Sequence, residues 1–400
     1  MYREKKTEVS ADDLENRNVR PLITEINTIL QEAVKKGISY EIPESLTRHL
    51  TENVYVFSGG KTLAELRELS DLLKDENGGV KPFSKFYQDT RKVHNQYNKA
   101  YLESEYQFAT QSAEMASKWA EYEADGDRYN LQYRTANDDR VRYSHQVLHD
   151  TTLPPGDSFW SKYFPPNGWR CRCNVVQVRK NRYPETDHET AMANGSKATY
   201  TVGAGGVNTS EMFRFNPGKQ QVVFPPHHPY FKDQKAVENA LRYNEKEERK
   251  SEYNALRKDK NYTDVRYNDK GGLMATHKEH TFDRHKGQYE KDVQKVLFDN
   301  GHKIILESET GKAIGQKYTD ALLDKLKAEI KTIEGDGKNT IKRAMQDAKK
   351  QGAESIILYF PDNGKFSMAR LADSIAAYNG QTKHRFTEIV FVVDGKVYRY

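Results

Sequence analysis

Residues 317–332, KYTDALLDKLKAEIKT, decide how the last third of this chain is interpreted. If Asp324 and Lys325 form a two-residue turn, the side chains on either side of it alternate between two faces of a β-hairpin. Asp320, Glu329 and Lys331 then fall together on one face. The other face is apolar and consists of Ala321, Leu323, Leu326, Ala328 and Ile330.

The charged face of this hairpin has a possible chemical use. Asp320 should lie opposite Glu329, with Cβ atoms roughly 5 Å apart, and like charges so placed destabilise a sheet. A Mg²⁺ ion between the two carboxylates would relieve the repulsion. Lys331 would follow about 6 to 7 Å along the strand, where an ammonium can orient water or neutralise charge on a phosphate. Glu290, on a preceding helix, is a further acidic candidate; the alternative is that all four are surface charges.

Residues 271–400 alternate helices and strands. Helices are expected over 287–301, 339–352 and 366–380, and strands over 302–309 and 355–360, in the hairpin, and on both sides of the Asp-Gly turn at 394–395. The order α-β-β-β-α-β-α-β-β predicts a mixed α/β domain.

The hairpin carries a family resemblance. Asp320, followed by Glu329-Ile330-Lys331 on the next strand and preceded by the helix with Glu290, resembles the core of PD-(D/E)xK nucleases, although Thr319 stands where those proteins have proline. More widely, residues 271–400 resemble the C-terminal tRNase toxin domain of CdiA-type contact-dependent inhibition proteins. This resemblance implies a metal-dependent endoribonuclease that cleaves tRNA, with Glu290, Asp320, Glu329 and Lys331 as its active site. It also implies a cognate immunity protein as a partner.

RNA contacts are expected on the helix after the hairpin, at Lys342, Arg343, Gln346 and Lys349, unless these form only a solvated helix face. His280, with His277 and His285, lies before the Glu290 helix. These histidines could touch phosphate or act as acid and base in a metal-free cleavage that uses the ribose 2′-OH. The alternative is that they are caps or surface residues.

The rest of the chain divides into three segments that differ in composition. Residues 1–130 contain amphipathic helical patterns, and residues 131–231 are rich in Pro, Gly and aromatic residues, typical of an irregular α+β module. Residues 232–270 are strongly charged and predict an exposed helical linker. We therefore expect a multidomain protein, with boundaries near 130, 231 and 270.

The irregular module contains His145 and the chain's two cysteines, Cys171 and Cys173, in WRCRC. One intervening residue would strain a disulfide between them. Together with His145 they could bind a structural Zn²⁺, which needs a fourth ligand such as His149 or an Asp. The alternative is two small buried thiols beside a hydrogen-bonded histidine.

This module resembles the Mu-F (phage head morphogenesis) domain, and weaker similarity covers most of residues 20–232. The resemblance implies a minor head protein that associates with phage portal and capsid proteins and performs no catalysis. It rests on Arg134, Asp139, Arg140, Arg142, His145, Pro166, Gly168, Trp169, Cys171, Arg172 and Cys173.

Composition is compatible with these expectations. The formal charge of +5 permits a nucleic-acid partner without requiring one. The first residues, MYREKKTEVSADD, lack the apolar core of a secretory signal, and no stretch approaches about 18 apolar residues, so we expect synthesis in the bacterial cytoplasm without membrane insertion.

Together, the two resemblances predict a polymorphic toxin carried in a phage virion and acting in a target-cell cytoplasm. The alternatives are a structural head protein whose last domain binds nucleic acid or capsid, and a metal-independent RNase of the barnase or colicin kind.

Overall fold

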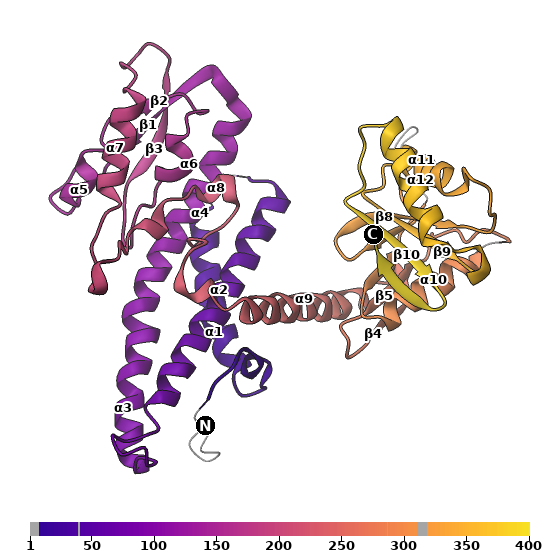
Figure 1. Ribbon diagram of the computed structural model, residues 1–400, viewed down its shortest axis with the longest axis horizontal. Helices are drawn as coiled ribbons and strands as arrows, with labels where there is room; N and C mark the ends of the chain where they lie inside the picture. Colours follow the sequence, from indigo (N-terminus) through magenta and orange to yellow (C-terminus); the bar gives the residue numbers. More distant parts are fainter. Residues whose placement is uncertain (1–7, 39–40, 286, 310–317) are drawn as a thin grey trace. The chain divides into compact units, whose positions relative to one another are not determined.

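The computed structural model describes all residues except 1–7, 39–40, 286 and 310–317, so Lys317 of the hairpin stretch lies outside the described residues (Figure 1). The chain divides into two compact units, residues 1–244 and 245–400. The expected multidomain organisation is confirmed, with a helix-rich first unit and a large mixed sheet in the second.

The first unit begins with long helices: α1 (Arg20–Gly37), α2 (Glu44–Asp71), α3 (Phe83–Asn95) and α4 (Leu102–Asp125), with a π-helical turn at Gln96–Tyr101 between α3 and α4. Helix α1 buries one apolar stripe, with Ile23, Ile26 and Leu30 in the core. Helix α1 ends at Gly37 and packs closely there on α4. A Cβ at Gly37 would lie 2.2 Å from the backbone oxygen of Thr110, so the contact requires glycine.

Helix α2 runs unbroken through residues 58–62, SGGKT, which are all buried. The Lys61 ammonium lies inside this helical core. It donates to Oε2 of Glu105 at 2.6 Å and to the backbone oxygen of Tyr97 at 2.7 Å. A buried charge is thus matched by an opposite charge and a carbonyl, as burial of an ion requires.

The irregular module is built around a three-stranded antiparallel sheet with the order β2-β1-β3. Its strands are β1 (Tyr129–Arg134), β2 (Thr152–Leu153) and β3 (Asn174–Arg179), and its helices are short: α5 (Tyr143–Gln146), α6 (Phe159–Tyr163), α7 (His188–Ala198) and α8 (Pro217–Gln220). Aromatic side chains fill the core of this module, whose strands and helices are mostly short. They include Trp119, Tyr133, Phe159, Trp160, Tyr163 and Phe164.

Short 3-10 helices occur in both units, at Ala11–Glu15, Gly126–Arg128, Ala204–Gly206, Glu211–Phe213, Pro229–Phe231 and Asn363–Lys365.

The predicted linker at 232–270 is helical in its first part, as α9 (Gln234–Leu256), but one face of the start of this helix is buried and not exposed. Ala236 and Ala240 are buried in the core of the first unit. Residues after 256 form β4 (Tyr262–Tyr267), which pairs with β5 (Leu273–His277) in the large sheet. The second unit therefore starts at residue 245, earlier than the expected 271, because a polar edge strand lacks the apolar run that marks a buried one.

In the described part of the second unit, eight strands form one mixed sheet in the order β11-β10-β9-β8-β7-β6-β5-β4. After β5 come α10 (Gly287–Asp299), β6 (Lys303–Leu306), β7 (Ala321–Leu323), β8 (Leu326–Thr332), α11 (Thr340–Gln351), β9 (Ser355–Phe360), α12 (Met368–Gln381), β10 (Glu388–Val393) and β11 (Lys396–Arg399). From α10 onward this is the predicted order; β4 and β5 were not predicted.

The hairpin register is confirmed. Strand β7 pairs with β8 through Ala321 with Ala328 and Leu323 with Leu326, and Asp324 adopts a positive φ of 50° in the turn. The apolar face of the hairpin packs with Val293 of α10. On the other face of the sheet, α11 and α12 cover β9 and β10. Glu329 and Lys331, which alternate with the α10-facing residues, point toward this second layer.

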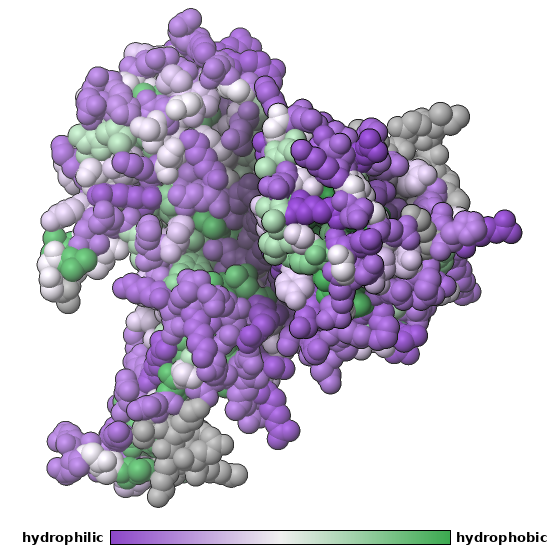
Figure 2. Space-filling view, turned by 45° about the vertical axis from the view of Figure 1, so that its right-hand side comes forward, coloured by the Kyte–Doolittle hydropathy of each residue, from purple (hydrophilic) through white to green (hydrophobic). Residues whose placement is uncertain are grey.

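Among the described residues, none of the helices has the length and apolar character that crossing a membrane would require. The face of the molecule in Figure 2 is mainly hydrophilic, with hydrophobic residues in small groups.

Candidate functional site

The charged face of the β7–β8 hairpin is drawn together by hydrogen bonds. Glu329 lies in the middle of β8 with 3% of its surface exposed. Its Oε1 accepts a hydrogen bond from Nζ of Lys331 at 2.6 Å, and its Oε2 accepts one from the backbone N–H of Asp320 at 3.4 Å. Lys331 is therefore positioned by Glu329, two residues earlier on the same face of the strand.

Asp320 lies one residue before the first paired residue of β7. Its Oδ2 accepts a hydrogen bond from the backbone N–H of Ile330 at 3.0 Å, and its backbone oxygen accepts one from Glu307 at 3.0 Å. Each of the two carboxylates thus receives an amide hydrogen bond from the other's strand. The sequence predicted the opposed carboxylates but not these amides, which stabilise the pair without an ion.

The two carboxylates favour protonation when no ion is present. Burial, together with the negative charge of Asp320, raises the pKa of Glu329 to about 7, although Lys331 acts in the opposite direction. Burial likewise raises the pKa of Asp320 above its usual value. Raised carboxyl pKa values of this kind are common at functional sites, because a buried like-charge pair binds a proton or a cation.

Glu290 is connected to the site by a hydrogen bond with His280. Oε2 of Glu290 lies 2.9 Å from Nε2 of His280, and Nδ1 of His280 lies 2.9 Å from the backbone oxygen of Glu307. An imidazole with acceptors at both nitrogens favours its doubly protonated form. Burial lowers the pKa of His280, but the hydrogen bonds to Glu290 and Glu307 outweigh it and raise that pKa overall.

Of the predicted active-site residues, Asp320, Glu329 and Lys331 are linked by hydrogen bonds, whereas Glu290 is bonded to His280. The charges of Lys331, Glu290 and His280 all act on the pKa of Asp320. The His280 side chain has no exposed surface, so the predicted RNA contact by His280 is replaced by an internal role. A two-carboxylate site fits Mg²⁺, which commonly takes one or two carboxylates and completes its shell with water or phosphate oxygens. Within the described residues these acidic groups do not form a close set of three ligand atoms, so the protein would supply two.

The predicted RNA-binding residues lie on α11 and differ in their contacts. Arg343 is exposed and Lys342 is half-buried. Nε2 of Gln346 donates to Gln381 at 3.3 Å, and Nζ of Lys349 donates to Thr382 at 2.8 Å. Gln346 and Lys349 thus link α11 to the end of α12, which leaves Lys342 and Arg343 as the better candidates for an RNA contact.

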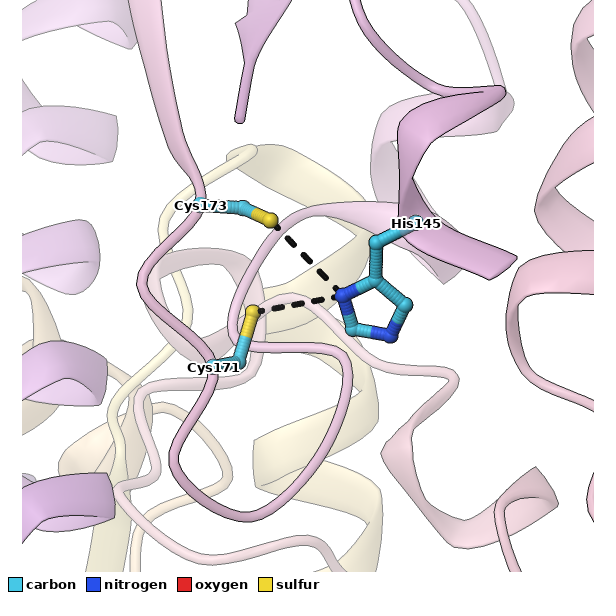
Figure 3. A group of neighbouring side chains, drawn as sticks. All are labelled: His145, Cys171 and Cys173. Carbon is cyan, nitrogen blue, oxygen red and sulfur yellow. Dashed lines mark hydrogen bonds between the residues drawn. The ribbon is translucent and has the colours of Figure 1, made fainter. Parts of the chain in front are cut away.

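A second cluster lies in the irregular module of the first unit (Figure 3). Nδ1 of His145, on α5, lies 3.8 Å from Sγ of Cys171 and 3.7 Å from Sγ of Cys173. Both cysteines come just before β3 in the chain. All three side chains are buried, and both cysteines are free thiols. The ligand atoms of these three residues all lie within 4.8 Å of one another, and among the described residues no other group of three or more His, Cys, Asp or Glu side chains does so.

The fourth zinc ligand suggested by the sequence is not at this cluster. His149 bonds elsewhere: its Nδ1 lies 3.2 Å from the backbone nitrogen of Thr135 and 2.9 Å from Oγ1 of the same residue. Hydrogen bonds from Cys173 and His145 hold the pKa of the Cys171 thiol well below its usual value. The cluster also borders a cavity of about 190 Å³ whose other lining residues are Ala136, Arg140, Val141, Arg142, Arg170 and Arg172.

Comparison with known proteins assigns a class to the region that contains this cluster. Residues 24–176, from α1 into β3, match the family described as Phage Mu protein F like protein. This segment is therefore phage Mu F-like, which confirms the resemblance over those residues.

Two relatives are found among curated proteins. The putative capsid assembly protein F of Escherichia phage Mu is 33% identical over 111 residues, which cover 27% of this chain and 25% of that protein. The Mu-like prophage FluMu F protein of Haemophilus influenzae is 37% identical over 67 residues, 15% of this chain and 16% of that protein. The chain thus spans a quarter or less of the length of these relatives. No solved structure matches it.

Proposed function

We propose that this chain is a phage head protein of the Mu F kind whose second unit is a metal-dependent endoribonuclease. The head assignment is supported by the match at residues 24–176 and by the relative named as a capsid assembly protein. Phage capsid and portal proteins are then its structural partners, and the virion is where it resides. The nuclease assignment is supported by the hairpin site.

The observation that carries the nuclease proposal is the arrangement of Asp320, Glu329 and Lys331. Two carboxylates lie at the junction of β7 and β8, and an ammonium is held by one of them at 2.6 Å. A stable hairpin does not require buried like charges. A divalent cation at Asp320 and Glu329 would supply Lewis-acid activation of the scissile phosphate.

The chain's own groups have distinct roles in this proposal. Asp320 and Glu329 bind the cation in their ionised forms, and each is oriented by a backbone N–H from the other strand. Lys331 positions the attacking water or offsets charge on the phosphate. Glu290 and His280 orient the end of β6 through the His280 bond to Glu307, which in turn donates to Asp320. Lys342 and Arg343 contact the RNA backbone.

The substrate proposed is tRNA, and the proposed place of action is the cytoplasm of a target bacterium. Such an activity requires an immunity protein in the producing cell. Expression of the full chain without that protein should be toxic, and the Lys331→Ala variant should relieve the toxicity.

The direct test incubates the full chain with total tRNA, with Mg²⁺ or with EDTA. Cleavage that requires Mg²⁺ and is lost in Asp320→Asn supports the proposal. No cleavage under any metal condition would leave a structural head protein with a non-catalytic second unit. Cleavage that survives EDTA and Asp320→Asn, but is lost in His280→Ala, would identify a metal-independent RNase instead.

A further inference from the structure

The second site of interest is the cluster of His145, Cys171 and Cys173, which the proposed nuclease does not use. Thiolate sulfur and imidazole nitrogen together are the ligands that Zn²⁺ prefers in proteins. The three side chains come from two separate segments, α5 and the residues before β3, and all three converge on one point. Two cysteines and a histidine that merely filled a core would not need to direct their donor atoms at each other.

The distances fit a tetrahedral metal. With Zn–S near 2.3 Å and Zn–N near 2.0–2.1 Å, tetrahedral angles place the sulfur and nitrogen ligands about 3.6 Å apart. The two sulfur-to-Nδ1 distances are 3.8 and 3.7 Å. These are long for a strong hydrogen bond but close to the separation across a bound ion.

We propose that Nδ1 of His145 and the Sγ atoms of Cys171 and Cys173 bind one Zn²⁺ ion, whose fourth ligand is a water from the adjoining cavity. The three ligand residues line that cavity, which at about 190 Å³ has room for water. His149, the nearest further histidine in sequence, is bonded to Thr135 instead.

The surroundings suit a site with two thiolates. Four arginines, at positions 140, 142, 170 and 172, line the same cavity. Arg142 donates to the backbone oxygen of Trp169, and Arg172 forms two hydrogen bonds to Asp138, at 2.6 and 2.7 Å. Their positive charges favour the ionised cysteines that a metal requires. Their bonds to the loop backbone and to Asp138 brace the walls around the ligands.

Such an ion would cross-link the least regular part of the first unit. Between β1 and β3 the chain has only the two-residue strand β2 and the short helices α5 and α6. A bond from α5 to the residues before β3 closes a loop of 26 to 28 residues. Closing a loop in the folded state alone stabilises that state, since the metal has no preformed site in the unfolded chain.

The test uses the full chain, freed of metal with a chelator and titrated with Co²⁺. Cys171 and Cys173 are the chain's two cysteines, so a sulfur-to-cobalt charge-transfer band can arise only from this cluster. We expect that band, and the intense visible bands of a four-coordinate ion, to saturate at one equivalent and to disappear on adding Zn²⁺. Absence of these bands in the folded chain would overturn the proposal.

Variants and a competing anion complete the design. Cys171→Ser and His145→Ala should lose stoichiometric binding, whereas the matched control His149→Ala should keep it; binding unchanged in Cys171→Ser would contradict the site. If a variant fails to fold, the wild-type titration still decides. Azide should shift the visible cobalt bands by replacing the water, and an unchanged spectrum would mean that a protein group holds the fourth position, which would overturn that part of the proposal.

Discussion

Nζ of Lys331 lies 2.6 Å from Oε1 of Glu329, and the Glu329 carboxylate lies beside Asp320 at the neck of the β7–β8 hairpin. This contact joins a buried acid of raised pKa to a half-buried ammonium on the same strand. Neither group is needed to build the hairpin, whose apolar face packs with α10. The contact is therefore the feature of the second unit that most needs a functional explanation.

The first prediction concerns catalysis. Glu329→Gln and Lys331→Ala should each lower the rate of tRNA cleavage on the order of 100-fold or more, because the first removes a cation ligand and the second removes the ammonium that offsets charge developing on the phosphate. The matched control is Lys327→Ala, an exposed lysine on the same strand, which should retain wild-type activity. Equal activity in all three variants would remove the hairpin site from the mechanism.

The second prediction concerns pH. The pKa of Glu329 is about 7 in the folded chain and 4.5 in its ordinary state. The folded state therefore binds the proton more tightly, so this contribution to stability is complete below about pH 4.5 and is lost as the pH rises through about 7. Glu329→Gln should lack this loss. Thermal unfolding of both proteins without metal, from about pH 4 to about pH 8, should show a smaller decline for the variant; parallel curves would contradict the raised pKa.

A metal should change the same titration. Because a bound cation favours the ionised carboxylate, Mg²⁺ should restore stability to the wild-type chain near pH 8 and should have less effect on Glu329→Gln. Equal stabilisation of the two proteins would place the ion elsewhere.

The third prediction concerns the start of the second unit. Arg249 of α9 donates to the backbone oxygens of Gly271 and Gly301, at 3.1 and 2.6 Å, and to Oδ1 of Asp324 at 2.8 Å. Arg249→Ala should destabilise the second unit by roughly 2–3 kcal/mol, because charged acceptors and carbonyls lose their donor. Lys250→Ala, an exposed neighbour, should be within about 0.5 kcal/mol of wild type.

The same contact predicts where a stable fragment begins. Residues 245–400 should fold cooperatively, as judged by thermal circular dichroism. Residues 271–400 should be less stable, because they lack Arg249 and the edge strand β4. Equal stability of the two fragments would show that α9 and β4 contribute nothing to the unit.

The fourth prediction concerns the buried pair Lys61 and Glu105, whose side chains are 0% and 4% exposed. Lys61→Met should cost about 3–5 kcal/mol, because it leaves a buried acid without a partner. The double variant Lys61→Met with Glu105→Leu should cost less than the single one, since both desolvated charges are gone. Exposed Lys99→Met is the matched control.

Tryptophan fluorescence measures this effect selectively. The chain's three tryptophans, at positions 119, 160 and 169, all lie in the first unit. Denaturant unfolding followed by this signal should shift in Lys61→Met and should be unchanged in Arg249→Ala. A double variant less stable than Lys61→Met would contradict the prediction, because Glu105 would then stabilise the fold without its partner.

Much of the second unit could be predicted from local patterns. The alternation in residues 317–332 determined the hairpin register, because a slip of one residue would turn Ala328 and Ile330 away from the core. Helix stripes and apolar strand runs determined the order of elements from α10 to β11. In the first unit, the motif ending in WRCRC predicted a resemblance to the phage Mu F family, and residues 24–176 match that family.

The other features of the fold and of the two sites were decided by tertiary structure, because they depend on contacts between residues that are distant in the chain. Strand β4 has no apolar signature and is recognised only through its pairing with β5. Glu290 is paired with His280 rather than standing alone beside the carboxylates, since the loop before α10 folds back on the end of β6. The amides that stabilise Asp320 and Glu329, and the convergence of His145 with Cys171 and Cys173, likewise result from packing between segments that no local periodicity brings together.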